Sequence, residues 1–171
     1  VTPYQIAYRY FSVVQLLFFI ICVPYWSATT DAYNKKDFAW IKNAGKTLDR
    51  IIMGIMTIAI FMIIVSKPVY KIWIGDANLV PFDLNIMVAI YVMILTLSMR
   101  YSYILNGFGT LRLQLIMTVT AAICYIPLAM IFCKNSNDIR YLLAVMCAVN
   151  VPGLIVNAIQ YFKIIKGKAQ G

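Results

Sequence analysis

Histidine and glutamate are absent from this 171-residue sequence, and charged residues make up only 12% of it. All six acidic residues are aspartates. Histidine and glutamate are among the commonest general bases, and histidine and cysteine dominate protein zinc sites. We therefore expect no catalytic residues, no metal site and no cofactor, and we expect that the protein is not an enzyme.

Cysteine is scarce, and we interpret the few cysteines as small buried hydrophobic residues. All four cysteines lie in apolar stretches, and no two form a C-x-x-C pair. This spacing argues against both a zinc site and a disulfide framework. The four positions are Cys22, Cys124, Cys133 and Cys147.

Hydrophobic residues are unusually frequent in this chain. They make up 63% of the chain, and the mean hydropathy is +0.81, whereas soluble domains are about 45–50% apolar. Most of the chain falls into apolar blocks of about the 20 residues that a helix needs to cross a bilayer. We predict an all-α integral membrane protein with one transmembrane region over residues 1–171. The expected spans are about 5–28, 48–66, 84–105, 111–133 and 141–163.

Two longer polar segments separate the first three spans. Residues 31–50 carry five cations together with Phe38 and Trp40, and this mixture favours an amphipathic helix at the membrane interface. Residues 67–83 contain Pro68, Gly75 and Pro81, which predict a loop. Shorter polar connections are expected at residues 106–109 and 134–140.

The distribution of lysine and arginine predicts the orientation. Cytoplasmic loops hold the excess of these residues. The ends that include residues 31–50 and the C-terminus carry ten of the 15 cations, and the opposite ends carry five. We therefore expect a cytoplasmic C-terminus, so that a cysteine placed at Asn135 is labelled from outside and one placed at Asn43 is not.

The formal net charge of +9 does not indicate a nucleic-acid partner. The cations are scattered at the ends of the spans, whereas nucleic-acid interfaces gather them on one face. Topology and contact with anionic lipid headgroups explain them more simply.

Six polar side chains within or near the spans are the candidate substrate-binding residues. Arg9 and Arg100 suit an anionic substrate because a guanidinium pairs with phosphate in a bidentate manner, although an arginine near a span end also reaches headgroups. The four amides suit hydrogen bonds between helices as well as substrate contact. They are Gln15, Gln114, Asn150 and Asn157.

Short motifs alternate with the apolar blocks in a familiar order. They are Thr2-Pro-Tyr-Gln-Ile-Ala7, Val23-Pro-Tyr-Trp-Ser-Ala28, Tyr103-Ile-Leu-Asn-Gly-Phe-Gly109, Leu111-Arg-Leu-Gln114 and Gln160-Tyr-Phe-Lys163. In this combination the chain resembles the C-terminal part of bacterial polysaccharide flippases. These are the O-antigen and capsule transporters of the multidrug/oligosaccharidyl-lipid/polysaccharide exporter superfamily.

The resemblance implies a two-lobe fold of about twelve helices, of which this chain is the last five. It implies transfer of undecaprenyl-diphosphate-linked oligosaccharide to the periplasmic leaflet of the bacterial inner membrane. Membrane lipids and glycan polymerases or glycosyltransferases are the implied partners, and Arg9 and Arg100 are the implied diphosphate contacts. A chain that opens at Val1 with an odd number of spans also suggests part of a longer transporter.

Two other functions fit the same residues. One is a small-molecule or drug exporter of the same superfamily, and the other is a membrane subunit of a glycan-assembly enzyme. An enzyme would place acidic or histidine residues in its outer loops, and the loops here are short and poor in both.

Overall fold

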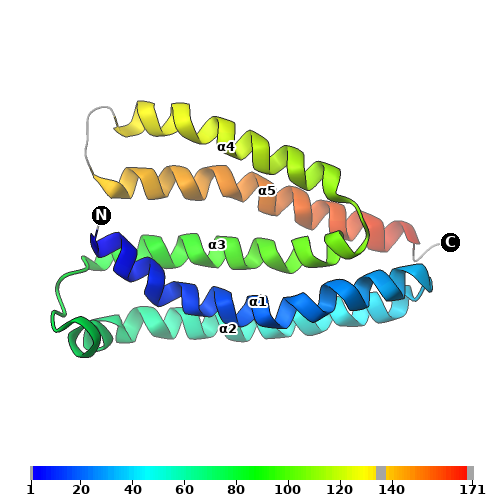
Figure 1. The fold of residues 1–171 in the computed structure, drawn as a ribbon, viewed down its shortest axis with the longest axis horizontal. Coiled ribbons are helices and arrows are strands. Elements are labelled where there is room, and N and C mark those ends of the chain that lie inside the picture. Colours follow the sequence, from blue (N-terminus) through cyan, green and yellow to red (C-terminus); the bar gives the residue numbers. More distant parts are fainter. Residues whose placement is uncertain (1, 134–137, 169–171) are drawn as a thin grey trace.

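The chain consists of five long α-helices in a computed structural model that describes residues 2–133 and 138–168 (Figure 1). Each helix is long and apolar enough to cross a membrane. The expected all-α architecture with five such helices is therefore confirmed. The helices are α1 (Thr2–Asn34), α2 (Phe38–Ile74), α3 (Phe82–Gly107), α4 (Leu111–Cys133) and α5 (Ile139–Lys168).

Successive helices run in opposite directions, so the connections gather at two ends (Figure 1). The start of α1 and the α2–α3 connection lie at what we call the N-terminal end. The α1–α2 and α3–α4 connections and the end of α5 lie at the C-terminal end. The cations of the described residues sort into the same two groups.

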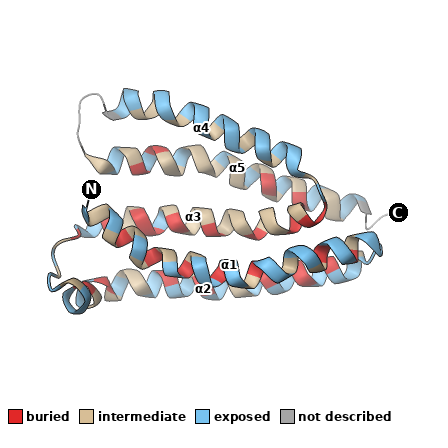
Figure 2. Ribbon diagram, in the orientation of Figure 1, coloured by how far each residue is buried: buried red, intermediate tan, exposed pale blue. Residues whose placement is uncertain are grey.

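Helix α3 is the centre of the bundle, because it contacts each of the other four helices. Helices α1 and α2 cover one side of it, α5 lies on another, and α4 lies mainly against α5. Figure 2 shows buried residues on α1, α2 and α3, whereas α4 has none in its described span. In a membrane, the outer face of α4 therefore meets lipid or another protein segment.

The polar segment before the second span is part of that span and not a separate interfacial helix. Helix α2 begins at Phe38, where the Asp37 side chain accepts a hydrogen bond from the Trp40 backbone N–H at 2.9 Å. It then continues without a break through Arg50. Ile41 and Leu48 are fully buried, so the segment contributes one face to the core.

The loop expected over residues 67–83 is also much shorter than the sequence indicates. Helix α2 passes Pro68 and ends at Gly75, whose φ of 84° is the left-handed conformation that favours glycine at a helix end. Membrane helices tolerate an internal proline where neighbours or side chains compensate the lost backbone bond.

Lys134 and Asn135, which were used to predict the orientation, lie outside the described residues.

Candidate functional site

Arg100 forms the most highly connected polar site of the described chain. Its side chain is 2% exposed. The Nε and Nη2 groups donate to the two carboxylate oxygens of Asp49 at 2.6 and 2.9 Å, and Nη2 also donates to the Gly45 carbonyl at 3.3 Å. This is a bidentate ion pair between α3 and α2.

Two tyrosine rings enclose the guanidinium. Its central carbon lies 4.3 Å from the ring centroids of both Tyr101 and Tyr161, a cation–π distance. A Cβ atom at Gly45 would lie 2.1 Å from the Tyr161 hydroxyl oxygen, so only glycine leaves room for that hydroxyl. Gly45, Asp49, Arg100, Tyr101 and Tyr161 together form what we call the Arg100 cluster, which joins α2, α3 and α5.

The α3–α5 interface remains polar beyond this cluster. Asn157 donates to the Ser102 hydroxyl at 3.3 Å, and Gln160 donates to the Thr110 carbonyl at 3.4 Å. The Asn157–Ser102 bond joins two helices, one of the two roles expected for Asn157, whereas the Gln160 bond joins α5 to the α3–α4 connection. The Arg100 Nη1 group and the Asn157 side-chain oxygen are buried without a partner among the described residues.

Most of the guanidinium N–H donors of Arg100 are hydrogen-bonded within the protein. Asp49 occupies the bidentate edge that a phosphate would need. Arg100 therefore holds helices together in this conformation, and only Nη1 remains for another acceptor.

Arg9 has a different environment. It is exposed on α1 and forms no ion pair with a described residue. Residues at intervals of three or four along α1 share its side of the helix. We call the polar members of this row the α1 polar strip. They are Gln5, Arg9 and Ser12 towards the start of α1 and Ser27, Thr30 and Asn34 towards its end, and the exposed apolar residues Leu16 and Val23 occupy the row between these two groups.

The polar strip differs from the exposed side next to it. The neighbouring exposed residues Val13, Leu17 and Ile20 are all apolar, as expected for contact with lipid. The opposite side of α1 is buried against the bundle, where Phe11 and Phe18 are almost fully enclosed. Helix α1 thus has a core face, an apolar outer face and a partly polar outer face.

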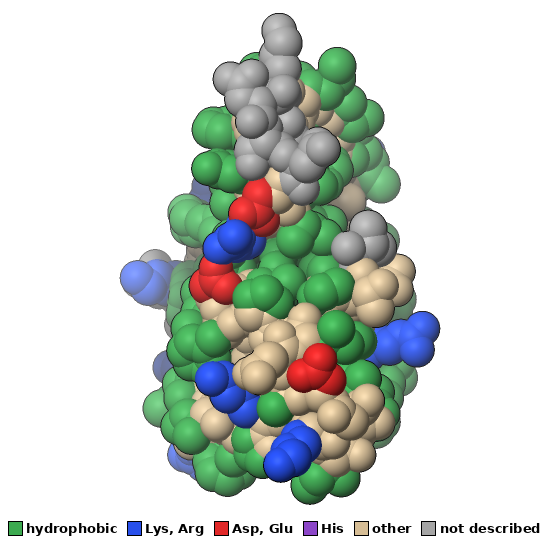
Figure 3. Space-filling view, turned by 90° about the vertical axis from the view of Figure 1, so that its left-hand side faces the viewer, with side chains coloured by type: hydrophobic (Ala, Val, Ile, Leu, Met, Phe, Trp, Pro, Cys, Tyr) green, Lys and Arg blue, Asp and Glu red, His purple; other side chains and the backbone are tan. Residues whose placement is uncertain are grey.

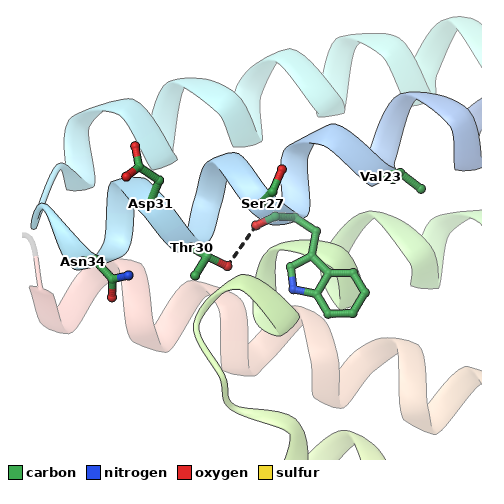
Figure 4. A pocket seen from close by; sticks show the side chains of 6 residues that line it. Val23, Ser27, Thr30, Asp31 and Asn34 are labelled. Carbon is green, nitrogen blue, oxygen red and sulfur yellow. Dashed lines mark hydrogen bonds between the residues drawn. The ribbon is translucent and has the colours of Figure 1, made fainter.

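Two grooves follow the partly polar face. One, of about 380 Å³, is lined by Ser12, Gln15, Phe19 and Met99 together with two neighbours on α1. The other, of about 620 Å³, lies at the C-terminal end of α1 (Figure 4). Its lining residues are Val23, Trp26, Ser27, Thr30, Asp31 and Asn34.

The remaining candidate amides lie apart from Arg100. The Gln15 amide contacts the Met99 sulfur at 3.7 Å between α1 and α3. Asn150 donates to the Met146 carbonyl within α5 at 2.7 Å. The Gln114 side chain is half-buried on α4 and hydrogen-bonds to no described residue. The six candidates therefore do not converge on one pocket.

Asp49, Gly45 and Tyr161 belong to the site but were absent from the sequence-based candidates. Asp49 lies inside α2, although the polar residues around it predict a connection. The pattern that could have revealed this is a row of apolar residues at helical spacing, which begins before the second apolar block and alternates with the cations. These residues are Ile41, Ala44, Leu48, Ile52 and Ile55, all buried.

A second group of charges lies at the N-terminal end. Arg140 pairs with Asp83 and, through Nε at 2.7 Å, with Asp138. A hydrogen bond from the Arg140 backbone N–H is the main reason that the pKa of Asp138 is lowered. Figure 3 looks onto this end and shows a few charged side chains on a largely hydrophobic surface. Among the described residues, no three metal-binding side chains gather anywhere.

Comparison with known proteins assigns no family. No protein-family model, no curated protein and no solved structure matches this chain. The five apolar helices indicate a multi-pass membrane protein, and its function must be argued from its own residues.

Proposed function

We propose that this chain is the C-terminal part of a two-lobe, twelve-helix polysaccharide flippase of the multidrug/oligosaccharidyl-lipid/polysaccharide exporter superfamily. Such a protein moves undecaprenyl-diphosphate-linked oligosaccharide from the cytoplasmic to the periplasmic leaflet of the bacterial inner membrane. The C-terminal end of the bundle is cytoplasmic in this proposal. The observation that supports it is the polar strip of α1.

The strip has one polar group towards each end of the crossing. Gln5 and Asn34 are separated by about 44 Å along a helix that rises 1.5 Å per residue, which exceeds the hydrocarbon thickness of about 30 Å. Leu16 and Val23 separate the two polar groups, so the strip offers the headgroup of an amphiphilic substrate polar contacts towards each end of the crossing. In this proposal the headgroup contacts the two polar groups in turn while the polyprenyl tail stays in lipid.

The hydroxyl groups of the strip are arranged as acceptors. Ser12, Ser27 and Thr30 each donate to a carbonyl of their own helix, at 2.9, 3.0 and 3.1 Å. Their oxygen lone pairs therefore remain for the hydroxyl protons of a sugar. The helix itself thus satisfies these donors when no substrate is present.

Arg9 is the diphosphate contact in this proposal, and Arg100 supports the bundle. Arg9 lies on the strip, is exposed and has no ion-pair partner among the described residues. Its guanidinium presents the planar fork that binds phosphate oxygens. Arg100 is buried and already paired with Asp49.

Deletion of the gene in its host, followed by an assay of which leaflet holds the lipid-linked oligosaccharide, tests the proposal. We expect accumulation in the cytoplasmic leaflet, with recovery by the wild-type protein and by Arg112→Ala, which alters an exposed arginine on α4. Arg9→Ala at equal expression should fail to restore export. Normal glycan export in the deletion strain would overturn the proposal in favour of a small-molecule exporter.

A further inference from the structure

A separate cavity of about 220 Å³ lies among α3, α4 and α5. Tyr91 of α3, Thr118 and Tyr125 of α4, and Met146 and Asn150 of α5 line it together with small apolar residues. Tyr91 is nine residues into α3, which is about 14 Å along the helix. The cavity therefore lies below the headgroup level at the N-terminal end.

Further tyrosines gather beside this cavity. The rings of Tyr4 and Tyr8 on α1 stack with centroids 5.9 Å apart, and Tyr8 lies 6.4 Å from Tyr91. Tyr125 lines the same cavity as Tyr91. Four tyrosines from three helices thus form one group, which we call the tyrosine cluster.

The hydroxyls of the cluster are available to a ligand. None of the four hydrogen-bonds to a described residue, whereas the buried Tyr70 hydroxyl of the same bundle does. Tyrosines in membrane proteins usually place their hydroxyls in the wet interface. At the depth of Tyr91 and Tyr125, the hydroxyls need either trapped water or a polar ligand.

The lining defines the chemistry of that ligand. Two tyrosine rings with their hydroxyls, the Thr118 hydroxyl and the Asn150 amide line the cavity, and no charged side chain of the described residues does. At this depth an anionic group would lie beside aromatic and apolar side chains without a cation, which is costly. A volume of 220 Å³ is also below the roughly 300–1,000 Å³ of pockets for drug-sized ligands. A neutral ring that has an apolar face and several hydroxyls fits both limits.

We propose that this cavity binds one neutral pyranose residue of the transported oligosaccharide, between Tyr91, Tyr125 and Asn150. The inference rests on the proposed flippase function and adds to it that the glycan contains an uncharged hexose-type unit. The aromatic rings stack on the C–H face of the sugar. The tyrosine hydroxyls and the Asn150 amide hydrogen-bond to its hydroxyl groups.

Saturation-transfer NMR on the full protein in lipid nanodiscs tests the proposal. The probes are methyl α-D-glucopyranoside, methyl α-D-galactopyranoside and methyl N-acetyl-β-D-glucosaminide, with methyl β-D-glucuronide as the charged comparison. We expect saturation transfer to at least one neutral glycoside and none to the glucuronide. Absence of transfer to every neutral glycoside would overturn the inference.

Variants locate the binding and separate it from loss of folding. Tyr91→Phe keeps the ring, so we expect about fivefold weaker binding from the loss of one hydrogen bond. Asn150→Leu should abolish the signal. Tyr103→Leu, on α3 but beside Phe19 and Trp26, should leave it unchanged. An equal loss in Tyr103→Leu would show that the signal does not report this cavity.

The leaflet assay distinguishes failure of this inference from failure of the proposed function. If the wild-type gene restores export but no neutral glycoside binds, the sugar site is wrong and the flippase function stands. If a glycoside binds at this cavity but deletion does not change the leaflet distribution, the flippase function fails. The claim that the bound sugar is a unit of transported glycan then fails with it.

Discussion

Helices α2 and α3 are joined by two polar groups, one charged and one neutral. At the C-terminal end, the Arg100 cluster uses a charged pair in which Arg100 is 2% exposed and Asp49 is 51% exposed. At the N-terminal end, Tyr70 donates to the Asn85 side-chain oxygen at 2.6 Å, and Asn85 donates to the Ser66 hydroxyl at 3.0 Å. That second network is neutral and fully buried.

The two groups differ in how completely they are satisfied. The Ser66 hydroxyl donates a hydrogen bond to the Ile63 carbonyl at 2.8 Å, so the neutral network is closed within two helices. The Arg100 cluster has an Nη1 group without a hydrogen-bond partner among the described residues, and it includes Tyr161 from α5. The neutral network therefore joins only α2 and α3. The charged cluster also contacts α5, and the stability of the bundle should depend more strongly on each residue of this cluster.

Removal of Asp49 should produce the largest change. Asp49→Ala leaves the buried Arg100 guanidinium without its counter-charge. Loss of one partner of a buried pair destabilises a protein by about 3–5 kcal/mol, and because Asp49 is half-exposed we expect about 3 kcal/mol. Unfolding of the detergent-solubilised protein by SDS titration, followed by circular dichroism, measures this difference.

The double variant Asp49→Leu with Arg100→Met is the control for that measurement. It removes both charges and keeps similar side-chain volumes, so we expect most of the lost stability to return. If the double variant is as unstable as Asp49→Ala alone, the unpaired charge is not the cause.

A methyl group at Gly45 should have the next largest effect. Gly45→Ala places a Cβ 2.1 Å from the Tyr161 hydroxyl oxygen, so Tyr161 must move away from Arg100. Overpacking of this kind usually destabilises by about 1–3 kcal/mol. The same SDS titration measures the change. Gly54→Ala is the matched control on the same helix, because its Cβ would meet nothing within 4 Å.

Tyr161→Phe combined with Gly45→Ala distinguishes the steric cause from a general effect. The double variant removes the clashing oxygen, and the ring carbon behind it would lie 3.3 Å from the new methyl group. We expect it to be more stable than Gly45→Ala alone. An unchanged or lower stability would argue against the clash.

The neutral network should tolerate substitution better. Tyr70→Phe removes one hydrogen bond to Asn85, and such bonds in membrane proteins contribute about 0.6 kcal/mol on average. We expect a loss of about 1 kcal/mol in the SDS titration, because the Asn85 oxygen is left buried without that donor. Tyr103→Phe, whose hydroxyl bonds to no described residue, should change stability by less. A Tyr70→Phe loss as large as that of Asp49→Ala would remove the distinction between the two groups.

The sequence predicts the class and number of helices because apolar runs as long as 51–65 and 111–132 have no other stable arrangement in a membrane. It does not predict where α2 begins. Lysines and Asp49 lower the local hydropathy, while the core-facing residues between them continue the helix. Because a hydropathy average along the sequence mixes the buried and exposed faces of a helix, it does not show that α2 extends through this polar segment.

The candidate site was only partly accessible for a related reason. Arg100 and Asn157 stand out as polar residues inside apolar blocks. The partner of Arg100 is 51 positions away in sequence, and nothing in a single sequence connects the two. Tyr91, Tyr125 and Asn150 likewise meet only because α3, α4 and α5 come together.

The smallest expected effect concerns pH at the start of α5. Folding lowers the pKa of Asp138 below its usual value of 3.8, chiefly because its ionised carboxylate accepts the Arg140 backbone N–H at 3.0 Å. The stabilisation is therefore present above the unfolded pKa and is lost as the pH falls through the lower folded value. Hydrogen exchange of the first-turn amides of α5, expressed as protection factors between about pH 5 and pH 2, measures the loss. Asp138→Asn cannot ionise at this position, so its protection should change less over that range; equal acid sensitivity in both proteins would assign the fraying to other groups.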